Sequence, residues 1–586
     1  MSVAPEHLVD CALRLRGCTR RGARFVRRGG TADFVPYDEV LTRAQAAAVA
    51  LQSHGVQPGD RVAIILPTCI GFLDAFLGAV LAGAIPAALY PPVRLGRLEE
   101  YYARTRRMLQ VIGARVLVTD ARVSRLLGAA VEGVASLEHV LEADDLASGD
   151  SGRWRHPDGD PDAPAFLQFS SGTTVEPKAV MISHRNALAN LAMIDRLFAD
   201  VTDAGAEQGG VCWLPLYHDM GLLGCMLLGL YHPGTITYIG PEQFIAQPAI
   251  WLRTLSEYKA LCSPAPDFAY ALCASKIKDR DLEGVDLSHW RFALNGAEPI
   301  DVDAMRRFSD RFGRWGFRPE AMMPVYGLAE AGLAVTFSDA DRPPRITEFD
   351  RDALAADRRA VPGTGRRLAS VGRPMPGLQL EVRDERDRPI PEGQVGTVLV
   401  RGPSITRGYF GNPELSARML RDGWLDTGDL GFLHQGELYI CGRQKDLVII
   451  RGRNYAPQEI EALATGTDGL RAGCIIAGGL VVEGEGEQLV ILAEKDARSA
   501  RPDEELAAEI RDRVVAGIGL MPQTVAVLTP GTLPRTSSGK LRRAAALEAY
   551  AAGRLSAPAR MTSIRLLKEL ARSQVAWGKR RLGLSD

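Results

Sequence analysis

The chain has 586 residues, with 70 basic and 71 acidic side chains, nine cysteines and an apolar share of 46%. That length predicts several domain-sized units with ample core, and the near-zero net charge argues against a nucleic-acid-binding protein. A charged share of 24% beside that apolar share is ordinary for a folded protein and excludes bulk disorder.

No targeting or membrane segment is predicted. The N-terminal residues show no basic run followed by a long apolar core, so we expect no signal peptide. The most apolar stretch, residues 71–89, contains Asp74 and Pro86 and predicts a buried helix leading into a strand, not a membrane span. The nine scattered cysteines form no CxxC pair and predict reduced core residues. These features are typical of a cytoplasmic enzyme.

The first 140 residues alternate between strand and helix patterns. Residues 61–66 and 115–119 are continuous apolar runs of strand length, as a sheet buried on both faces requires. Helical patterns over residues 41–54 and 71–82 alternate with them. This alternation predicts an α/β fold with a largely parallel, doubly wound sheet.

The pattern changes several times further along the chain. A polar linker over residues 142–164 leads to a second α/β region at 166–338. Residues 339–367 are polar and rich in proline and glycine, which predicts an inserted surface segment. Residues 369–443 carry short alternating runs with turn signals and predict an antiparallel β-subdomain. A smaller α+β unit is expected after Lys445.

The expected organisation therefore has three parts. Residues 1–444 form a large N-terminal domain of doubly wound sheets plus the β-subdomain, residues 445–550 a small mobile α+β domain, and residues 551–586 a helical tail. The tail helix is expected over residues 562–581, with basic side chains interspersed. Those basic side chains suit an acidic carrier protein, an anionic surface or a simple solvated helix face.

Within the tail helix, apolar side chains recur on one side. They are Ile564, Leu567 and Leu570. Spacings of three residues place side chains on the same face of a helix.

A loop rich in hydroxyl groups gives the strongest local signal of function. It follows the apolar run 165–167, and its candidate phosphate-binding residues are Ser170, Ser171, Gly172, Thr173, Thr174 and Lys178. Such hydroxyl and backbone N–H groups can surround phosphate oxygens, and lysine adds a point charge. The G-x-x-x-x-G-K-[ST] spacing of a P-loop is absent. The absence of a G-x-S-x-G elbow argues against a Ser/His/Asp hydrolase.

Six further motifs follow this loop in chain order. They are WLPLYHDMG at 213–221, ALNGAEP at 293–299, VYGLAE at 325–330, GWLDTGDLG at 423–431, GRQKDLVIIRG at 442–452 and LPRTSSGK at 533–540. The ordered set closely resembles the acyl-adenylate-forming (ANL) superfamily, which includes acyl-CoA synthetases, luciferases and nonribosomal adenylation domains. The resemblance covers about residues 41–543.

Within that superfamily the chain is most similar to the fatty-acyl-AMP ligase and acyl-CoA synthetase branch. The run LYPP at 89–92, the motifs at 218–221, 295–299 and 326–330, and the inserted segment at 339–367 point to the fatty-acyl-AMP ligases. In those ligases the inserted segment is held to pack against the large domain and to hinder the rotation that CoA chemistry needs.

The resemblance implies roles for individual residues. Lys540 would reach both the substrate carboxylate and the α-phosphate, and Glu330 would be the magnesium ligand. Adenine and ribose would be held by Gly296, Ala297, Glu298, Tyr326, Gly327, Asp429 and Arg443. The acyl pocket would include His218, Asp219 and Asn295. Lys445 would be the hinge between the domains.

The implied reaction uses ATP and Mg²⁺ to convert a hydrophobic carboxylic acid to acyl-AMP, with release of pyrophosphate. The acyl group would then pass to a phosphopantetheine thiol on an acyl carrier protein, or to a partner acyltransferase or ligase, in lipid or secondary-metabolite biosynthesis. The alternative is an acyl-CoA synthetase that completes the CoA thioester itself. The sequence leaves open the acid, which is fatty, aryl or polycyclic, and the oligomeric state.

The phosphate loop departs from the superfamily at two positions. Val175 and Ala179 stand where glycine is usual, and glycine there permits φ > 0 or a close approach to phosphate. These changes suggest a third hypothesis, a non-catalytic binding module of the same fold. The retention of Lys540, Glu330 and Asp429 argues against that hypothesis.

Overall fold

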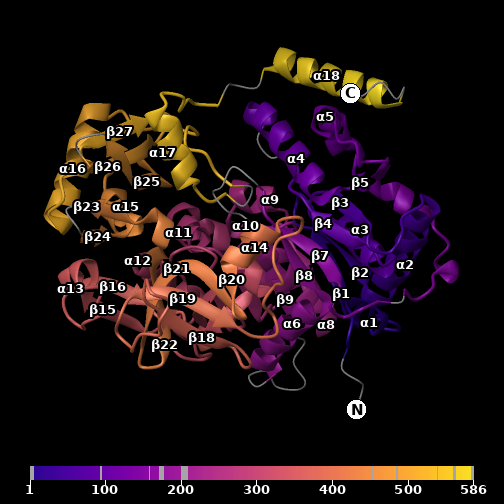
Figure 1. The fold of residues 1–586 in the computed structure, drawn as a ribbon, viewed down its shortest axis with the longest axis horizontal. Coiled ribbons are helices and arrows are strands. Elements are labelled where there is room, and N and C mark those ends of the chain that lie inside the picture. The colour runs from indigo at the N-terminus through magenta and orange to yellow at the C-terminus, as the bar shows by residue number, and fades with distance from the viewer. Residues whose placement is uncertain are drawn as a thin grey trace.

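The structure is a computed structural model. It describes residues 5–92, 95–157, 159–170, 177–199, 209–450, 453–482, 486–536, 539–558 and 562–581. Figure 1 shows a large body, a smaller C-terminal domain at one end of it, and a terminal helix that returns to the N-terminal part of the chain. None of the helices described is both long and apolar enough to span a bilayer.

The first sheet has six strands in the order β6-β5-β3-β4-β7-β8. Their bounds are β3 Arg61–Ile65, β4 Ile85–Ala88, β5 Val116–Thr119, β6 His139–Glu142, β7 Pro164–Phe169 and β8 Ala179–Ser183. All neighbours are parallel except β7 and β8. The strands predicted at 61–66 and 115–119 are confirmed as β3 and β5.

Helices cover both faces of this sheet. They are α2 Tyr37–Ser53, α3 Ile70–Leu81, α4 Leu98–Ile112 and α5 Ala121–Val131. Along β3, Val62 and Ile64 join the core that contains α2 and α3, while Ala63 and Ile65 join the core that contains α4 and α5. Because alternate residues of a strand point to opposite faces, this division confirms the predicted doubly wound arrangement.

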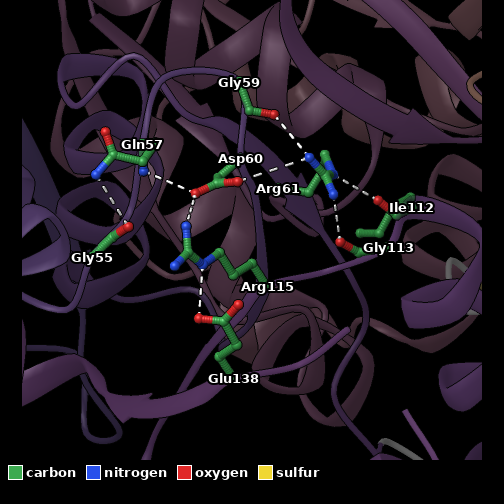
Figure 2. A network of polar contacts seen from close by, with 9 residues as sticks. All are labelled: Gly55, Gln57, Gly59, Asp60, Arg61, Ile112, Gly113, Arg115 and Glu138. Atoms are coloured by element: carbon green, nitrogen blue, oxygen red, sulfur yellow. Dashed lines mark hydrogen bonds and ion pairs between the residues drawn. The ribbon is translucent and has the colours of Figure 1, made fainter. Parts of the chain in front are cut away.

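A polar network ties together the N-terminal ends of these strands (Figure 2). The Arg61 guanidinium donates to three backbone carbonyl oxygens over 2.9–3.1 Å, those of Gly59, Ile112 and Gly113. Arg115 pairs with Asp60 at 2.7 Å and with Glu138 at 2.9 Å. Because ligands of open α/β sheets bind at the carboxyl ends of strands, this network stabilises the edge opposite to any site.

The second sheet has nine strands in the order β17-β14-β13-β12-β11-β9-β10-β1-β2. Their bounds are β1 Gly22–Val26, β2 Ala32–Pro36, β9 Gly209–Cys212, β10 Thr235–Tyr238, β11 Cys262–Ala265, β12 Phe292–Asn295, β13 Met322–Gly327, β14 Ala334–Phe337 and β17 Arg373–Pro374. The central strands are parallel, and antiparallel pairs lie at both edges. The main helices beside it are α6 His184–Ala199, α10 Ala249–Glu257, α11 Asp267–Lys276 and α12 Val302–Phe312.

The predicted antiparallel β-subdomain is confirmed. Its strands are β18 Gln379–Arg383, β19 Gly396–Arg401, β20 Leu420–Arg421, β21 Trp424–His434 and β22 Glu437–Arg443. Helix α14 Pro413–Met419 precedes β20.

The inserted segment is more ordered than its polar sequence indicates. It forms the hairpin β15 Ile346–Asp350 and β16 Gly365–Ala369 around helix α13 Arg351–Ala356. Phe349 is fully buried, with its ring 5.0 Å from Phe432 and 5.5 Å from Tyr439 of the β-subdomain. The segment is therefore part of the large domain's core.

The small domain has the predicted α+β composition. It contains the hairpin β23 Val448–Ile450 and β24 Arg453–Tyr455 and a sheet of β25 Leu470–Val482, β26 Gly486–Lys495 and β27 Thr524–Leu528. Its helices are α15 Pro457–Thr465, α16 Asp503–Ile518 and α17 Arg543–Ala551. Ile475, Ile491 and Ile510 belong to a separate hydrophobic core. The nine cysteines of the chain are all free thiols, as predicted.

The predicted tail helix is confirmed as α18 Ser563–Arg581. It packs on α5 of the large domain, and it lies across the top of α4 and α5 in Figure 1. The Ser573 hydroxyl accepts a hydrogen bond from the Gly128 amide at 2.8 Å, and the Trp577 indole donates to the Ser124 carbonyl at 3.0 Å. The tail thus returns the chain to the large domain.

Candidate active site

A cleft of 2620 Å³ lies between the large and small domains. Most of the predicted site residues line it, namely Ser170, Lys178, His218, Asp219, Ala297, Glu298, Tyr326, Gly327, Glu330, Asp429, Arg443, Lys445 and Lys540. Ser171, Gly172, Thr173, Thr174 and Val175 lie outside the described residues. The motifs are far apart in the sequence, and the fold brings them to one cavity.

The small domain contributes Lys540 to this cleft. Its Nζ donates a hydrogen bond to the Ala297 carbonyl of the large domain at 2.5 Å. Desolvation in the cleft lowers the pKa of the Lys540 ammonium, while the carboxylates of Glu298 and Asp219 favour its charged form. Lys540 is therefore a cation held next to the large domain's polar groups.

A tyrosine, an aspartate and an arginine form a second polar group in the cleft. Asp429 of β21 accepts hydrogen bonds from the Tyr326 hydroxyl at 2.7 Å and from Arg443 Nε at 2.9 Å. Asp429 and Arg443 are paired across the β21–β22 ladder. Burial and the neighbouring Asp429 carboxylate raise the pKa of Tyr326, so its hydroxyl keeps its proton and donates. The trio thus presents a fixed carboxylate beside an aromatic ring.

The backbone next to strand β13, which carries Tyr326, requires small residues. A Cβ on Gly296 would lie 2.7 Å from Val325 Cγ2 and 2.8 Å from the Val325 carbonyl oxygen. Ala297 has φ = 67°, in the left-handed region that side chains disfavour. Gly327 likewise has no room for a Cβ, because the Leu333 carbonyl occupies that position. These residues leave an open backbone surface beside the strand that carries Tyr326.

Glu330 is held by a residue that the sequence analysis missed. Glu330 Oε1 accepts a hydrogen bond from the Tyr409 hydroxyl at 2.8 Å. Lys178 Nζ lies 5.5 Å from the centre of the same Tyr409 ring. Tyr409 follows Gly408 in a loop of the β-subdomain, and a Gly-Tyr turn alone carries no functional signal. One tyrosine therefore links the two predicted phosphate and metal ligands.

The phosphate loop starts and ends on adjacent antiparallel strands. The Ser170 amide donates to the Lys178 carbonyl at 3.1 Å, which brings the two ends of the loop together. Ala179 is buried in β8 and paired with Phe169 of β7. It does not have positive φ, so the loss of glycine at this position introduces no backbone strain.

His218 and Asp219 lie together at the start of a short helical turn. His218 Nδ1 is 2.6 Å from Asp219 Oδ1. Burial opposes ionisation of Asp219, but His218 and then Lys540 favour it and lower its pKa to about 2. The following residues, Leu222–Leu227, form a π-helix, a feature frequent at functional sites.

Asn295 lies behind the cleft wall. Its side-chain amide donates to Asp267 Oδ1 at 2.9 Å, and Asp267 lines the cleft. Burial, with the nearby Glu298 carboxylate, raises the pKa of Asp267 well above its usual range. Asp267 has no motif that marks it as a site residue, because an aspartate at the first position of helix α11 is typical of a helix N-terminus.

A two-domain α/β fold with a lysine of the small domain in a cleft beside an aromatic–carboxylate–arginine trio defines an adenylate-forming enzyme of the ANL superfamily. The chain belongs to the family of AMP-binding enzymes, which it matches over residues 19–410.

Two curated relatives illustrate this similarity. A long-chain-fatty-acid–AMP ligase of Mycobacterium marinum, FadD26, is 34% identical, over 89% of this chain and 92% of that protein. A medium-chain-fatty-acid–[acyl-carrier-protein] ligase of Moorena producens, JamA, is 32% identical, over 92% of this chain and 93% of that protein.

Solved structures agree with these relatives. A structure from work on fatty acyl-adenylate ligases of E. coli and L. pneumophila aligns with a TM-score of 0.87 and 34% identity, over 93% of this chain and 98% of its own. A fatty acyl-adenylate ligase of L. pneumophila in complex with acyl adenylate and pyrophosphate aligns with a TM-score of 0.70 and 30% identity, over 93% and 96%.

Proposed function

We propose that this chain is an ATP- and Mg²⁺-dependent ligase that converts a fatty acid to acyl-AMP and then passes the acyl group to the phosphopantetheine thiol of a carrier protein. The observation that carries the proposal is the position of Lys540, whose Nζ reaches the Ala297 carbonyl in the cleft that Tyr326 also lines. The mobile small domain supplies the cation, and the large domain supplies the binding surface.

The first step joins two anions. A carboxylate oxygen of the acid attacks the α-phosphorus of ATP, the bond from that phosphorus to the bridging oxygen breaks, and pyrophosphate leaves. Lys540, Lys178 and Arg443 line the cleft and provide positive charge for this encounter. An electrostatic group of this kind typically contributes about 3–4 kcal/mol, or a hundredfold or more in rate.

The nucleotide would lie across the trio and the open backbone surface. Asp429 would accept the ribose hydroxyls, Arg443 would donate to the ribose, and Tyr326 would stack on adenine against the backbone at 296–298. The phosphates would meet the loop that begins at Ser170 and ends at Lys178. Because Asp429 is fixed by two hydrogen bonds, this arrangement is preorganised for binding.

Glu330 suits a magnesium ion that arrives with ATP. Magnesium usually keeps several waters and takes only one or two carboxylates beside phosphate oxygens. The described residues contain no cluster of three or more His, Cys, Asp or Glu that would form a complete protein cage. The Tyr409 hydroxyl orients the Glu330 carboxylate for this role. When bound, the ion would neutralise phosphate charge.

The acid would occupy the apolar part of the cleft. Its wall includes Trp213, Met220, Leu228, Phe268, Leu333 and Phe337. These side chains favour a hydrophobic chain, and the named relatives act on medium- and long-chain fatty acids. His218 and Asp219 would lie near the carboxylate end, beside Lys540.

The proposed domains are residues 1–444 and 445–550, followed by the tail at 551–586. The second step needs a hinge between the first two. Lys445 lies in the short 3₁₀ turn Gln444–Asp446 between β22 and β23. The thiol sulfur of the carrier attacks the acyl carbonyl and AMP leaves. The inserted segment contacts both domains through α13. Its contacts oppose rotation of the small domain, which favours a carrier over free CoA as acceptor, because a carrier protein can offset those contacts with its own binding energy.

Mass spectrometry tests the proposal. The enzyme is incubated with ATP, Mg²⁺ and a panel of fatty acids, first alone, then with CoA, and then with holo-acyl carrier proteins. We expect acyl-AMP without acceptor, acyl-loaded carrier with a carrier protein, and little acyl-CoA. Acyl-CoA formed as fast as acyl-carrier would replace the proposal with the acyl-CoA synthetase alternative, and no acyl-AMP from any acid would overturn adenylation.

A further inference from the structure

Helix α18 has one face that packs on the large domain. On that face Ser573 is fully buried and Ala576 is nearly so. The contact is close, because a Cβ on Gly128 of α5 would clash with the Ser573 carbonyl. Two ion pairs add to it, Arg572 with Glu99 and Lys579 with Glu132. The helix is therefore fixed in orientation.

The opposite face of α18 is apolar and exposed. Ile564, Leu567 and Val575 are 80%, 65% and 60% exposed. Their spacing of three and eight residues places them on one stripe of a helix. We call the exposed surface formed by Ile564, Arg565, Leu567, Lys568 and Val575 the tail face.

The tail face is also basic. Residues 563–581 contain six basic residues and one acidic residue, although the whole chain is nearly neutral. Arg565 and Lys568 form no ion pair with any residue that the structure describes. Their charges, next to the apolar stripe, therefore remain available to a partner.

The tail face lies next to the rim of the active-site cleft. Arg572 of α18 pairs with Glu99, and the neighbouring residues Arg97 and Glu100 line the cleft. These two residues also contact the small domain, because Arg97 donates to the Thr532 carbonyl at 3.0 Å and Glu100 pairs with Arg542 at 3.3 Å. Figure 1 shows α18 lying above α4 and α5.

We propose that the tail face docks an acidic helix of the phosphopantetheine-bearing carrier protein that receives the acyl group. This inference rests on the proposed function. The apolar stripe offers helix-spaced anchors, and its basic flank complements an acidic partner. A second copy of the chain would bring like charges together, which disfavours self-association. Because α18 is fixed to the large domain, the tail face keeps its position on the large domain while the small domain moves.

The test compares two thiol acceptors, a holo-acyl carrier protein that the wild type loads and free pantetheine. The variants are Leu567→Glu and the double variant Arg565→Glu/Lys568→Glu, all at exposed positions away from the packed face. We expect each variant to raise the KM for the carrier about tenfold or more, because the loss of a hot-spot side chain typically weakens binding by more than a factor of ten. Acyl-AMP formation and transfer to pantetheine should stay at the wild-type rate. The charge variant should also lose the salt dependence of carrier transfer.

The matched control is Val481→Glu, which adds the same charge at an apolar position of β25 that is 83% exposed. It should leave the carrier KM unchanged. An equal KM in wild type and tail-face variants would overturn the inference and leave the proposed function intact. If the wild-type enzyme loads no carrier protein, both the inference and the proposed function are overturned.

Anionic vesicles of phosphatidylglycerol and phosphatidylcholine provide the remaining comparison, because basic amphipathic helices also bind such surfaces. We expect no difference in co-sedimentation between wild type and variants. Vesicle binding lost in the variants, with carrier transfer unchanged, would assign the tail face to a membrane and overturn the inference.

Discussion

Arg351 of the inserted segment and Glu459 of the small domain form an ion pair, with Arg351 Nε 2.6 Å from Glu459 Oε1. The same guanidinium donates to the Gly517 carbonyl, and Asp352 pairs with Arg453 at 3.0 Å. The segment therefore contacts the small domain as well as the core of the large domain. These contacts hold the two domains in the arrangement that places Lys540 in the cleft.

We expect Arg351→Ala to loosen this arrangement. A partly exposed ion pair together with one hydrogen bond contributes about 1–2 kcal/mol, which corresponds to a shift of about 5–30-fold between orientations. Acyl-CoA formation should rise several-fold while acyl-AMP formation stays nearly constant, as measured by mass spectrometry. Arg342→Ala is the control, because among the described residues Arg342 pairs with Asp339 alone, within the segment. Unchanged acyl-CoA formation in Arg351→Ala would show that these bonds do not restrain the small domain.

The arrangement of domains was largely predictable from the sequence, and these contacts were not. Strands β3 and β5 were predictable because burial on both faces requires continuous apolar runs. The inserted segment looked like a surface excursion because its single buried aromatic, Phe349, is surrounded in sequence by polar residues. Arg351 and Glu459 are 108 positions apart, and no local pattern signals such a pair.

The candidate site likewise combines residues that the sequence predicted with residues that it did not predict. Ordered motifs placed Lys540, Asp429 and Glu330 in the sequence, because each motif is short and contiguous. Tyr409 and Asp267 were missed, because each contributes one side chain from a loop or helix start that has no motif of its own. Their proximity to Glu330 and Asn295 depends on the packing of separate elements.

Lys540 should give adenylation a falling limb at high pH. Because desolvation favours the neutral amine, its folded-state pKa lies below the ordinary 10.5. The charged form is present below that pKa and is lost as pH rises through it. As pH rises, kcat/KM for ATP should therefore begin to decline before pH 10.5 is reached. Lys540→Arg should lower the rate and remove the falling limb, since the guanidinium stays charged. Lys540→Met should lower acyl-AMP formation about a hundredfold or more, and an unchanged rate would contradict the role of the ammonium.

Arg61→Ala should destabilise the fold without affecting adenylation. Three backbone carbonyls lose a charged donor at the N-terminal edge of the six-stranded sheet (Figure 2). The expected loss in the free energy of unfolding is about 1–3 kcal/mol, measured from the midpoint of urea denaturation. Arg27→Ala should have almost no effect, because the side chains of Arg27 and Asp33 are 66% and 50% exposed. A midpoint equal to that of Arg27→Ala would show that the network does not contribute.

Lys445→Pro should separate the two half-reactions. Lys445 lies in the 3₁₀ turn Gln444–Asp446, and the φ fixed by proline is compatible with that conformation. Rotation of the small domain needs a change of φ and ψ at the hinge, and proline prevents the change of φ. Acyl-AMP formation should therefore remain close to the wild-type rate, while single-turnover transfer to the holo-carrier should fall about tenfold or more. Lys445→Ala is the control, since it removes the side chain from the cleft and leaves the backbone free to rotate. If Lys445→Pro transfers the acyl group as fast as Lys445→Ala, the hinge lies elsewhere.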